Sequence, residues 1–207
     1  MAKLDLKKSL KSYYTAGSTP EIVNLPLAQY ISISGKGDPD GDSFKEHISL
    51  LYPVAYHIKF KYKALDKDFV VPPLEGQWWF DEYKYALVLM EDAPTEIPRS
   101  EWEYRLMIRM PDFVKKEAFE IALKETANKK ALKGLEKLEW FEMEEGKSLQ
   151  ILHKGPFHTE PESLEKLTRY MLEHDLKRNG FHHEIYLSDF RKTAPEKLKT
   201  ILREPVI

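Results

Sequence analysis

Two stretches of the sequence repeat one order of secondary-structure signals. Each has an alternating apolar strand, a turn, a capping box that opens an amphipathic helix, and then two further strand-like runs. Residues 27–110 carry the first copy and residues 146–207 the second, with residues 111–145 between them as an inserted helix and connecting segment. The repeat predicts an α+β fold of two pseudo-symmetric strand–helix–strand–strand modules around a central cleft. We expect residues 1–207 to form a single domain.

Short motifs predict where the elements begin and end. Ser43 with Glu46, and Thr159 with Glu162, have the capping-box spacing, and each pair precedes apolar residues at helical spacing. The buried stripe of the second helix is predicted as Leu164, Leu167, Met171, Leu172 and Leu176. Strands are predicted over 27–34, 69–79, 102–110, 147–155, 182–189 and 198–206. The connecting segment is predicted to hold a helix over 112–130, capped by Asp112, and a run over 137–144 that suits a hairpin with 147–153.

The run HHEIYLSD places a carboxylate near the start of a strand. Alternation puts Glu184 and Tyr186 on one face of this strand, with Ile185 and Leu187 on the other, where they suit a helix-covered core. For a lone glutamate, a solvated sheet face is the alternative. When the two copies are superposed by element, PPLEGQWW falls opposite HHEIYLSD, and Glu75 falls opposite Glu184. A cleft between the modules would then carry one glutamate from each half.

Large aromatic side chains are the candidate walls of this cleft. Trp79 shares the face of the first-half glutamate unless Gly76 introduces a bulge, whereas Trp78 points to the opposite face and is expected in or under the sheet. Tyr52 and Tyr56 project from the first helix, and all four aromatic residues are candidate ligand contacts. Carboxylates in an aromatic cleft suit either the binding of a cationic ligand on the rings or general acid–base catalysis.

Composition argues against several classes of function. The 32 basic residues nearly balance the 34 acidic ones, so the chain lacks the electrostatic footprint of a protein that binds nucleic acid or an anionic membrane. The absence of cysteine excludes a disulfide framework, a thiolate metal site and a cysteine nucleophile. The sequence has neither a signal-peptide core nor a run of about 18 apolar residues, from which we expect a soluble, cytoplasmic protein.

The sequence predicts neither a metal site nor a cofactor. His182 and His183 point to opposite faces of a strand and cannot chelate one ion together. A zinc site that also uses His153 and His158 stays an alternative. The turn GKGDPDGD lacks the phosphate-loop motif, and its alternating aspartates lack the glycine and glutamate that a calcium loop needs.

Several of these pieces together resemble one family. The segments PPLEGQWW, RMPDFV, LHKGPF and HHEIYLSDFRKTAPEKLKTILREPV, in this order, are similar to the GyrI-like small-molecule-binding proteins from about Leu27 to Ile207. The resemblance implies two strand–helix–strand–strand modules around a central cleft. In the related effector-binding domains of multidrug-responsive regulators, a strand glutamate contacts cationic aromatic drugs, and by motif match this glutamate is Glu184. The chain carries no helix-turn-helix, so no direct DNA role is expected.

For stand-alone members, the resemblance implies hydrolysis of cyclopropanoid DNA-alkylating natural products, which is a detoxification activity. Glu184 and Glu75 are then the candidate catalytic carboxylates, one activating water and one protonating the oxygen that becomes phenolic, and Tyr186 would orient Glu184 or donate to that oxygen. The expected partner is a planar aromatic small molecule, and the expected assembly is a monomer or weak dimer. The alternative is a non-catalytic module that sequesters drugs or senses them for a partner protein, and a gyrase-interacting inhibitor ranks below both.

Overall fold

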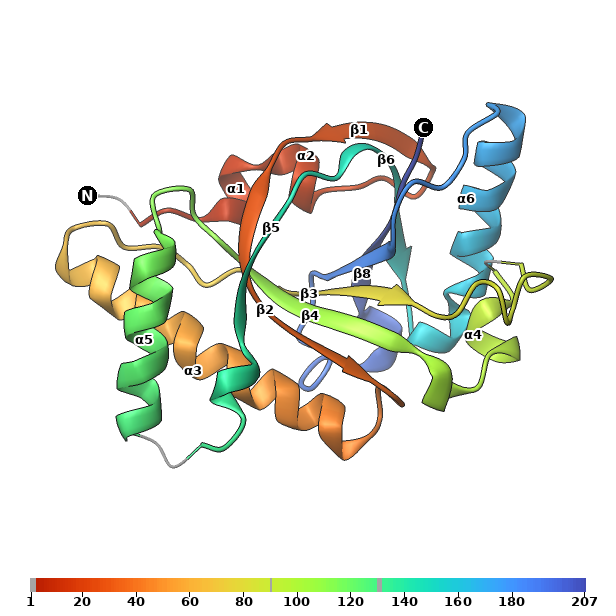
Figure 1. Ribbon diagram of the computed structural model, residues 1–207. Helices are drawn as coiled ribbons and strands as arrows, with labels where there is room; N and C mark the ends of the chain where they lie inside the picture. The colour runs from red at the N-terminus through yellow and green to blue at the C-terminus, as the bar shows by residue number, and fades with distance from the viewer. Residues whose placement is uncertain (1–2, 90, 130–131) are drawn as a thin grey trace.

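An antiparallel sheet of eight strands forms the centre of the molecule in the computed structural model, which describes residues 3–89, 91–129 and 132–207 (Figure 1). The strand order is β1-β6-β8-β7-β3-β4-β2-β5. The strands are β1 (Glu21–Leu25), β2 (Ala28–Lys36), β3 (Leu74–Trp79), β4 (Glu103–Met110), β5 (Glu139–Met143), β6 (Gly146–Lys154), β7 (His182–Tyr186) and β8 (Lys199–Pro205). The helices are α1 (Leu6–Ser9), α2 (Lys11–Tyr14), α3 (Asp42–Ala64), α4 (Ala93–Glu96), α5 (Lys116–Lys129) and α6 (Pro161–Glu173). The α+β fold class predicted from the repeat is confirmed.

The two copies of the repeat correspond to two consecutive sets of elements. The first set is β2, α3, β3 and β4, and the second is β6, α6, β7 and β8. Each set contributes three neighbouring strands to the sheet, and β3 of the first set pairs with β7 of the second at the centre. Both halves therefore have the order strand–helix–strand–strand, while their pseudo-symmetry and the module boundaries stay predictions.

Two short connections make the sheet curl round on itself. β1 and β2 lie far apart in the strand order, yet only residues 26–27 separate them in the chain, and only residues 144–145 separate β5 from β6. Three peptide units reach at most about 11 Å, so the two regions of the sheet must approach each other. Antiparallel strand pairing continues on both sides of these connections, with the pairs Leu25–Gly146 and Ala28–Met143. The strands arch round accordingly (Figure 1).

The hairpin predicted between 137–144 and 147–153 is wrong. β5 pairs with β2, whereas β6 pairs with β1 and β8. Gly146 lies at the join with φ of 64°, a left-handed conformation that favours glycine. The chain runs on from β5 into β6 instead of folding back, because each of the two strands has another partner.

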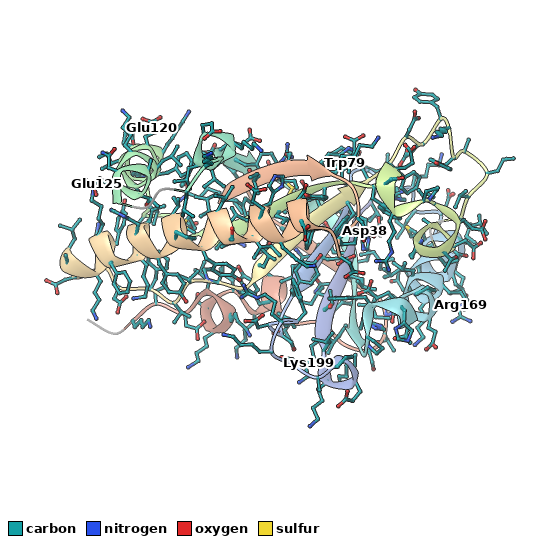
Figure 2. The ribbon with its side chains drawn as sticks, turned by 90° about the horizontal axis from the view of Figure 1, so that it is seen from below. Asp38, Trp79, Glu120, Glu125, Arg169 and Lys199 are labelled. Carbon is teal, nitrogen blue, oxygen red and sulfur yellow. The ribbon has the colours of Figure 1, made fainter. Side chains whose placement is uncertain are left out.

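Helices α3 and α6 cover the same face of the sheet. Apolar residues of α3, including Leu51, Val54 and Ile58, pack on the buried side chains of β2, β3 and β4. Leu164 and Leu167 of α6 pack on β6 and β8. α5 lies beside α3 (Figure 2), and its Glu125 pairs with Lys61 and His57 of α3 at 3.1 and 2.7 Å.

The helix boundaries differ from those predicted. α3 and α6 begin at Asp42 and Pro161, and neither N-cap residue makes a side-chain hydrogen bond to its helix. α5 begins at Lys116 and not near Asp112, and residue 130 of its predicted span lies outside the described residues. Leu172, which was predicted in the buried stripe of α6, is 79% exposed. Because an α-helix turns by about 100° per residue, Leu172 projects away from the face on which Leu164, Leu167 and Met171 are buried.

The N-terminal segment covers the opposite face of the sheet. Leu6, Tyr13 and Tyr14 of α1 and α2 pack against Ile185 and Ile201. The central strands β3 and β7 are therefore covered on both faces, by α3 and α6 on one side and by α1 and α2 on the other. None of the helices in the described part of the chain is long and apolar enough to cross a membrane.

Candidate functional site

The register of the central strand pair decides which side chains meet. Glu184 of β7 lies opposite Gly76 of β3, and Glu75 lies opposite Ile185. Residues that face each other across an antiparallel pair project from the same side of the sheet. Glu184 and Tyr186 therefore share the side of Gly76 and Trp78, under helices α3 and α6, whereas Glu75 projects to the other side.

The prediction that Glu75 and Glu184 share one cleft is therefore wrong, and so is the choice between the two tryptophans. Trp78, and not Trp79, lies on the side of Glu184. Trp79 stacks on Phe181, with ring centroids 4.5 Å apart and an interplanar angle of 21°. Superposing the halves by element aligned their glutamates, but a shift of one residue in register moves a side chain to the other face of the sheet.

A cavity of about 390 Å³ opens over the central strands between α3 and α6, and we call it the inner cavity. Trp78 and Tyr186 rise from the sheet beneath it. Its polar lining consists of Glu160, His182 and Glu184, together with Asp40, Thr95, Arg99, His158 and Arg178. Its other aromatic walls are Phe44, Phe80, Trp102, Phe157 and Phe190. The arrangement suits a flat, largely apolar ligand with one polar or electrophilic centre.

The floor of the inner cavity is held by one hydrogen bond between aromatic side chains. Trp78 donates from Nε1 to the hydroxyl of Tyr186 at 3.1 Å, and the Trp78 ring stacks on Phe44 at 5.7 Å between centroids. Gly76 lies under this contact, and a Cβ at this position would come within 3.0 Å of the Tyr186 hydroxyl and 3.1 Å of Trp78 Nε1. The glycine therefore makes room for the two rings beside Glu184 and does not create a bulge.

Two carboxyl groups of different character line the inner cavity. Glu160 precedes α6, is 7% exposed, and its Oε1 has no hydrogen-bond partner in the described part of the chain. Burial, together with the nearby Glu184 carboxylate, raises the pKa of Glu160 well above its usual value. Burial and Glu184 likewise raise the pKa of Tyr186. Both shifts favour the protonated forms of Glu160 and Tyr186, which are the forms that can donate a proton.

His182 links Glu184 to a buried ion-pair chain. Its Nε2 lies 3.5 Å from Glu184 Oε1, its Nδ1 bonds Glu204, and Glu204 pairs with Arg178 at 3.1 Å. Burial alone would lower the pKa of His182, but Glu204 and Glu184 outweigh it and raise the pKa to about 10. A protonated His182 therefore orients Glu184 at neutral pH. No group of three or more His, Asp or Glu in the described ranges is placed to hold a metal ion.

Glu75 belongs to a separate polar network on the far side of the sheet. It is fully buried and accepts hydrogen bonds from the hydroxyls of Tyr13 at 2.5 Å and Tyr14 at 3.1 Å. His183 Nε2 lies 3.1 Å from Glu75 and its Nδ1 lies 2.7 Å from Glu145. These contacts satisfy both oxygens of Glu75, and they tie the N-terminal segment to the sheet.

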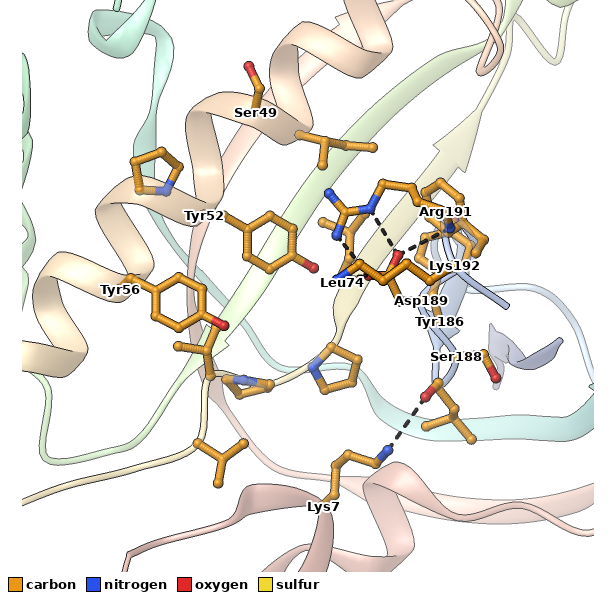
Figure 3. Close-up of a pocket in the computed structure, with 18 of the residues that line it drawn as sticks. Lys7, Ser49, Tyr52, Tyr56, Leu74, Tyr186, Ser188, Asp189, Arg191 and Lys192 are labelled. Atoms are coloured by element: carbon orange, nitrogen blue, oxygen red, sulfur yellow. Dashed lines mark hydrogen bonds and ion pairs between the residues drawn. The ribbon is translucent and has the colours of Figure 1, made fainter. Parts of the chain in front are cut away.

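Tyr52 and Tyr56 line a second hollow of about 900 Å³, which we call the outer groove (Figure 3). It runs between α3, residues 70–74 and residues 186–192, which comprise the end of β7 and the loop after it. Its lining includes Tyr186 and Phe190, which also line the inner cavity. The aromatic residues predicted on α3 thus line a hollow, but it is not the one that contains Glu184.

Glu184 and Tyr186, which the sequence interpretation named, line the inner cavity, and so does Trp78, which it expected in or under the sheet. The interpretation missed Glu160, the pairing of His182 with Glu184, and the wall formed by Phe44 and Trp102. Glu160 stands directly before Pro161 at the start of an amphipathic helix. A carboxyl group at this position is a signal that the sequence offers, because it lies between a predicted strand and the helix that covers the sheet.

Comparison with known proteins finds similar solved structures. A search of curated proteins found no match. Among solved structures, an uncharacterized conserved protein from Listeria innocua is 36% identical, with a TM-score of 0.88 over 99% of this chain and 100% of that chain. A hydrolase from Listeria innocua is also 36% identical, with a TM-score of 0.85 over 99% of this chain and 100% of that chain.

A more distant solved structure shares the fold alone. The C-terminal domain of EcmrR is 13% identical, with a TM-score of 0.54 over 91% of this chain and 97% of that chain. The sequence profile of the GyrI-like small molecule binding domain matches residues 18–206, which is most of the chain and includes every strand of the sheet. The protein therefore belongs to the GyrI-like small-molecule-binding family.

Proposed function

We propose that the protein binds planar aromatic small molecules in the inner cavity and opens the strained ring of cyclopropanoid substrates with water. The observation that carries the proposal is a pair of carboxyl groups of opposite character in an aromatic-walled cavity. Glu160 is buried, its Oε1 has no hydrogen-bond partner among the residues that the structure describes, and Glu184 is held by His182. A carboxyl group whose pKa is raised by burial, beside a carboxylate held by a histidine, suits general acid–base catalysis.

The chemistry follows from a cyclopropane joined to a cyclohexadienone. Glu184 accepts a proton from water as the water oxygen bonds to the ring methylene. The bond from that methylene to the ring carbon breaks, and its electron pair makes the six-membered ring aromatic. Glu160 then gives its proton to the former dienone oxygen, so the net change is the addition of one water molecule. Glu184 returns its proton through solvent, and Glu160 is protonated again.

The walls of the inner cavity fit the shape of such substrates. Trp78, Phe44 and Tyr186 offer flat faces on which a conjugated ring system can stack. The hydrolase from Listeria innocua, which is 36% identical over nearly the whole chain, supports a hydrolytic reaction for this protein. The proposed role of the second carboxylate therefore passes from Glu75, which projects from the other side of the sheet, to Glu160.

Substitution of each carboxyl group tests the proposal. Glu184→Gln and Glu160→Gln keep the shape of the cavity and remove the base and the acid. We expect each to lower the turnover of a spirocyclopropyl cyclohexadienone by about 100-fold or more, because each removes a proton-transfer group. Ring opening is followed by mass spectrometry, and binding of the ring-opened product by fluorescence. The matched control is Glu162→Gln, an exposed residue two positions from Glu160, which should turn over normally.

A binding module without catalysis is the second candidate, because carboxyl groups among aromatic rings also suit cationic dyes. In that case the wild-type protein leaves the dienone intact. Glu184→Gln then weakens the binding of cationic aromatic dyes and leaves the binding of neutral aromatic ligands nearly unchanged. The enzyme proposal is supported if the wild type turns over the dienone and Glu184→Gln does not, while both bind the ring-opened product equally well. Equal turnover in the wild type and both Gln variants would reject the assignment of these two carboxyl groups.

A further inference from the structure

The inner cavity and the outer groove meet at one pair of aromatic side chains. Tyr186 and Phe190 line both hollows. Their rings lie 5.5 Å apart between centroids, and Phe190 also contacts Phe157 at 5.8 Å on the side of the inner cavity. Tyr186 and Phe190 therefore form the wall that the two hollows share.

The wall of the outer groove on α3 is a ladder of aromatic rings. Tyr52, Tyr56 and Phe60 recur at every fourth residue, and successive ring centroids lie 6.4 and 6.3 Å apart with interplanar angles near 30°. Figure 3 shows Tyr52 and Tyr56 directed from α3 toward the loop after β7. Tyr56 is 46% exposed and Phe60 58%, so the ladder leads from the covered end of the groove to solvent.

The charged groups around the outer groove are engaged with neighbours in the protein. Arg191 holds Asp189 through two hydrogen bonds of 2.9 and 3.1 Å and lies over the Tyr52 ring. Lys7 donates to the Leu187 carbonyl at 3.5 Å, and His57 is bound to Glu125. Asp5, which also lines the groove, accepts a hydrogen bond from the Lys7 backbone amide at 3.1 Å. Within the described lining, the carboxyl groups of the groove therefore have partners beside its aromatic and proline surface, whereas Glu160 Oε1 in the inner cavity has none.

We propose that the outer groove is a second subsite, which holds the neutral, planar part of an elongated ligand whose reactive or cationic end occupies the inner cavity. This inference rests on the proposed function for the identity of the inner end. The ladder on α3 then determines which extensions the protein accepts, and Tyr56 is a specificity residue for the outer end. A ligand confined to the inner cavity does not touch Tyr56 and gains nothing from it.

The test compares two probes that share one reactive unit. The short probe is a spirocyclopropyl cyclohexadienone with a small acyl group, and the long probe carries a planar bicyclic aromatic amide in its place. We expect Tyr56→Ala to lower kcat/KM for the long probe by about 3- to 10-fold, the size of one lost stacking contact, and to leave the short probe unchanged. Tyr56→Phe keeps the ring and should behave as the wild type. The matched control is Tyr83→Ala, since Tyr83 is 98% exposed and lines neither hollow.

The outcomes separate this inference from the proposed function. If both probes are hydrolysed and Tyr56→Ala affects them equally or not at all, the second subsite is rejected while the proposed hydrolysis stands. If neither probe is hydrolysed, the ring-opened forms of both are titrated by fluorescence. Weaker binding of the long form alone to Tyr56→Ala then supports the subsite without catalysis, and equal binding to wild type and variant rejects it.

Discussion

At the scale of single residues, a buried network of charged side chains lies on the side of the sheet opposite the inner cavity. Arg203 is fully buried and bonds Glu145 at 3.0 Å, while His183 contacts Glu145 from the other side at 2.7 Å. Burial alone would raise the pKa of Glu145, but His183 and Arg203 outweigh it and lower the pKa to about 2. Glu145 lies in the two-residue connection between β5 and β6, so the network also fixes the point at which the sheet curls.

Replacing Glu145 should therefore destabilise the protein. Glu145→Gln leaves Arg203 buried without its counter-charge, and breaking a buried pair in this way costs about 3–5 kcal/mol. Glu145 has a lowered pKa, so its contribution is present above pH 4.5 and is lost as the pH falls toward about 2. Urea denaturation at pH 7 should show the full difference, and at pH 3 a smaller one. The exposed neighbour Glu144 offers the control Glu144→Gln, and an equal effect of both changes would contradict the prediction.

The residues of the site could be predicted only where alternation within one strand was enough. Glu184 and Tyr186 lie together because they alternate on β7, whereas Trp78 joins them only through the register of β3 against β7. Glu75 was assigned to the wrong face because the register between two strands is a property of the sheet, and no pattern within either strand encodes it. Glu160 comes from the start of a helix, and its approach to Glu184 depends on how α6 packs over the central strands.

At the scale of elements, the strand pair β3–β7 supplies the floor of the inner cavity, and Gly76 is the position that makes this possible. A Cβ there would come within 3.0 Å of the Tyr186 hydroxyl. Glycine is unfavourable inside a strand, so its presence between Glu75 and Gln77 reflects the space that the Trp78–Tyr186 contact occupies.

Gly76→Ala should therefore damage the site more than the fold. Overpacking by the added methyl group destabilises the folded state by about 1–3 kcal/mol. The lower flexibility of the unfolded chain stabilises the protein by only about 0.4–1 kcal/mol. We expect a net loss of stability, together with weaker binding of planar aromatic dyes in fluorescence titrations. Gly17→Ala is the control, because its Cβ would meet nothing closer than 3.8 Å. Unchanged dye affinity in Gly76→Ala would contradict the role given to this glycine.

Most elements could be predicted because each has its own local pattern. Apolar alternation located β2, β4, β6 and β8 to within a few residues, and helical spacing located α3 and α6. The partner of β5 could not be predicted, because a hairpin and a continuous strand have the same local pattern. The outcome depends on β2, which lies more than 100 residues away in the sequence and pairs with β5 along its free edge.

At the scale of the whole molecule, the connections over residues 26–27 and 144–145 join the two halves of the sheet at a second place. The halves meet once at the pairing of β3 with β7, and again where β1 and β2 run alongside β6 and β5. The N-terminal segment closes the polar network between them. Two modules joined in this way share one core interface and should not unfold separately.

The last prediction tests this cooperativity. All four tryptophans lie between residues 78 and 140, so their fluorescence reports on the first half and the connecting segment, whereas circular dichroism reports on the whole chain. Leu167 is fully buried on α6 in the second half, and Leu167→Ala should lower stability by about 2–5 kcal/mol. We expect both signals to shift to the same lower urea concentration, because the first half cannot stay folded when the second unfolds. Leu172→Ala, on the same helix but 79% exposed, should change neither signal appreciably. A tryptophan transition that stays at the wild-type urea concentration, while circular dichroism becomes biphasic, would show two independent modules in place of one folding unit.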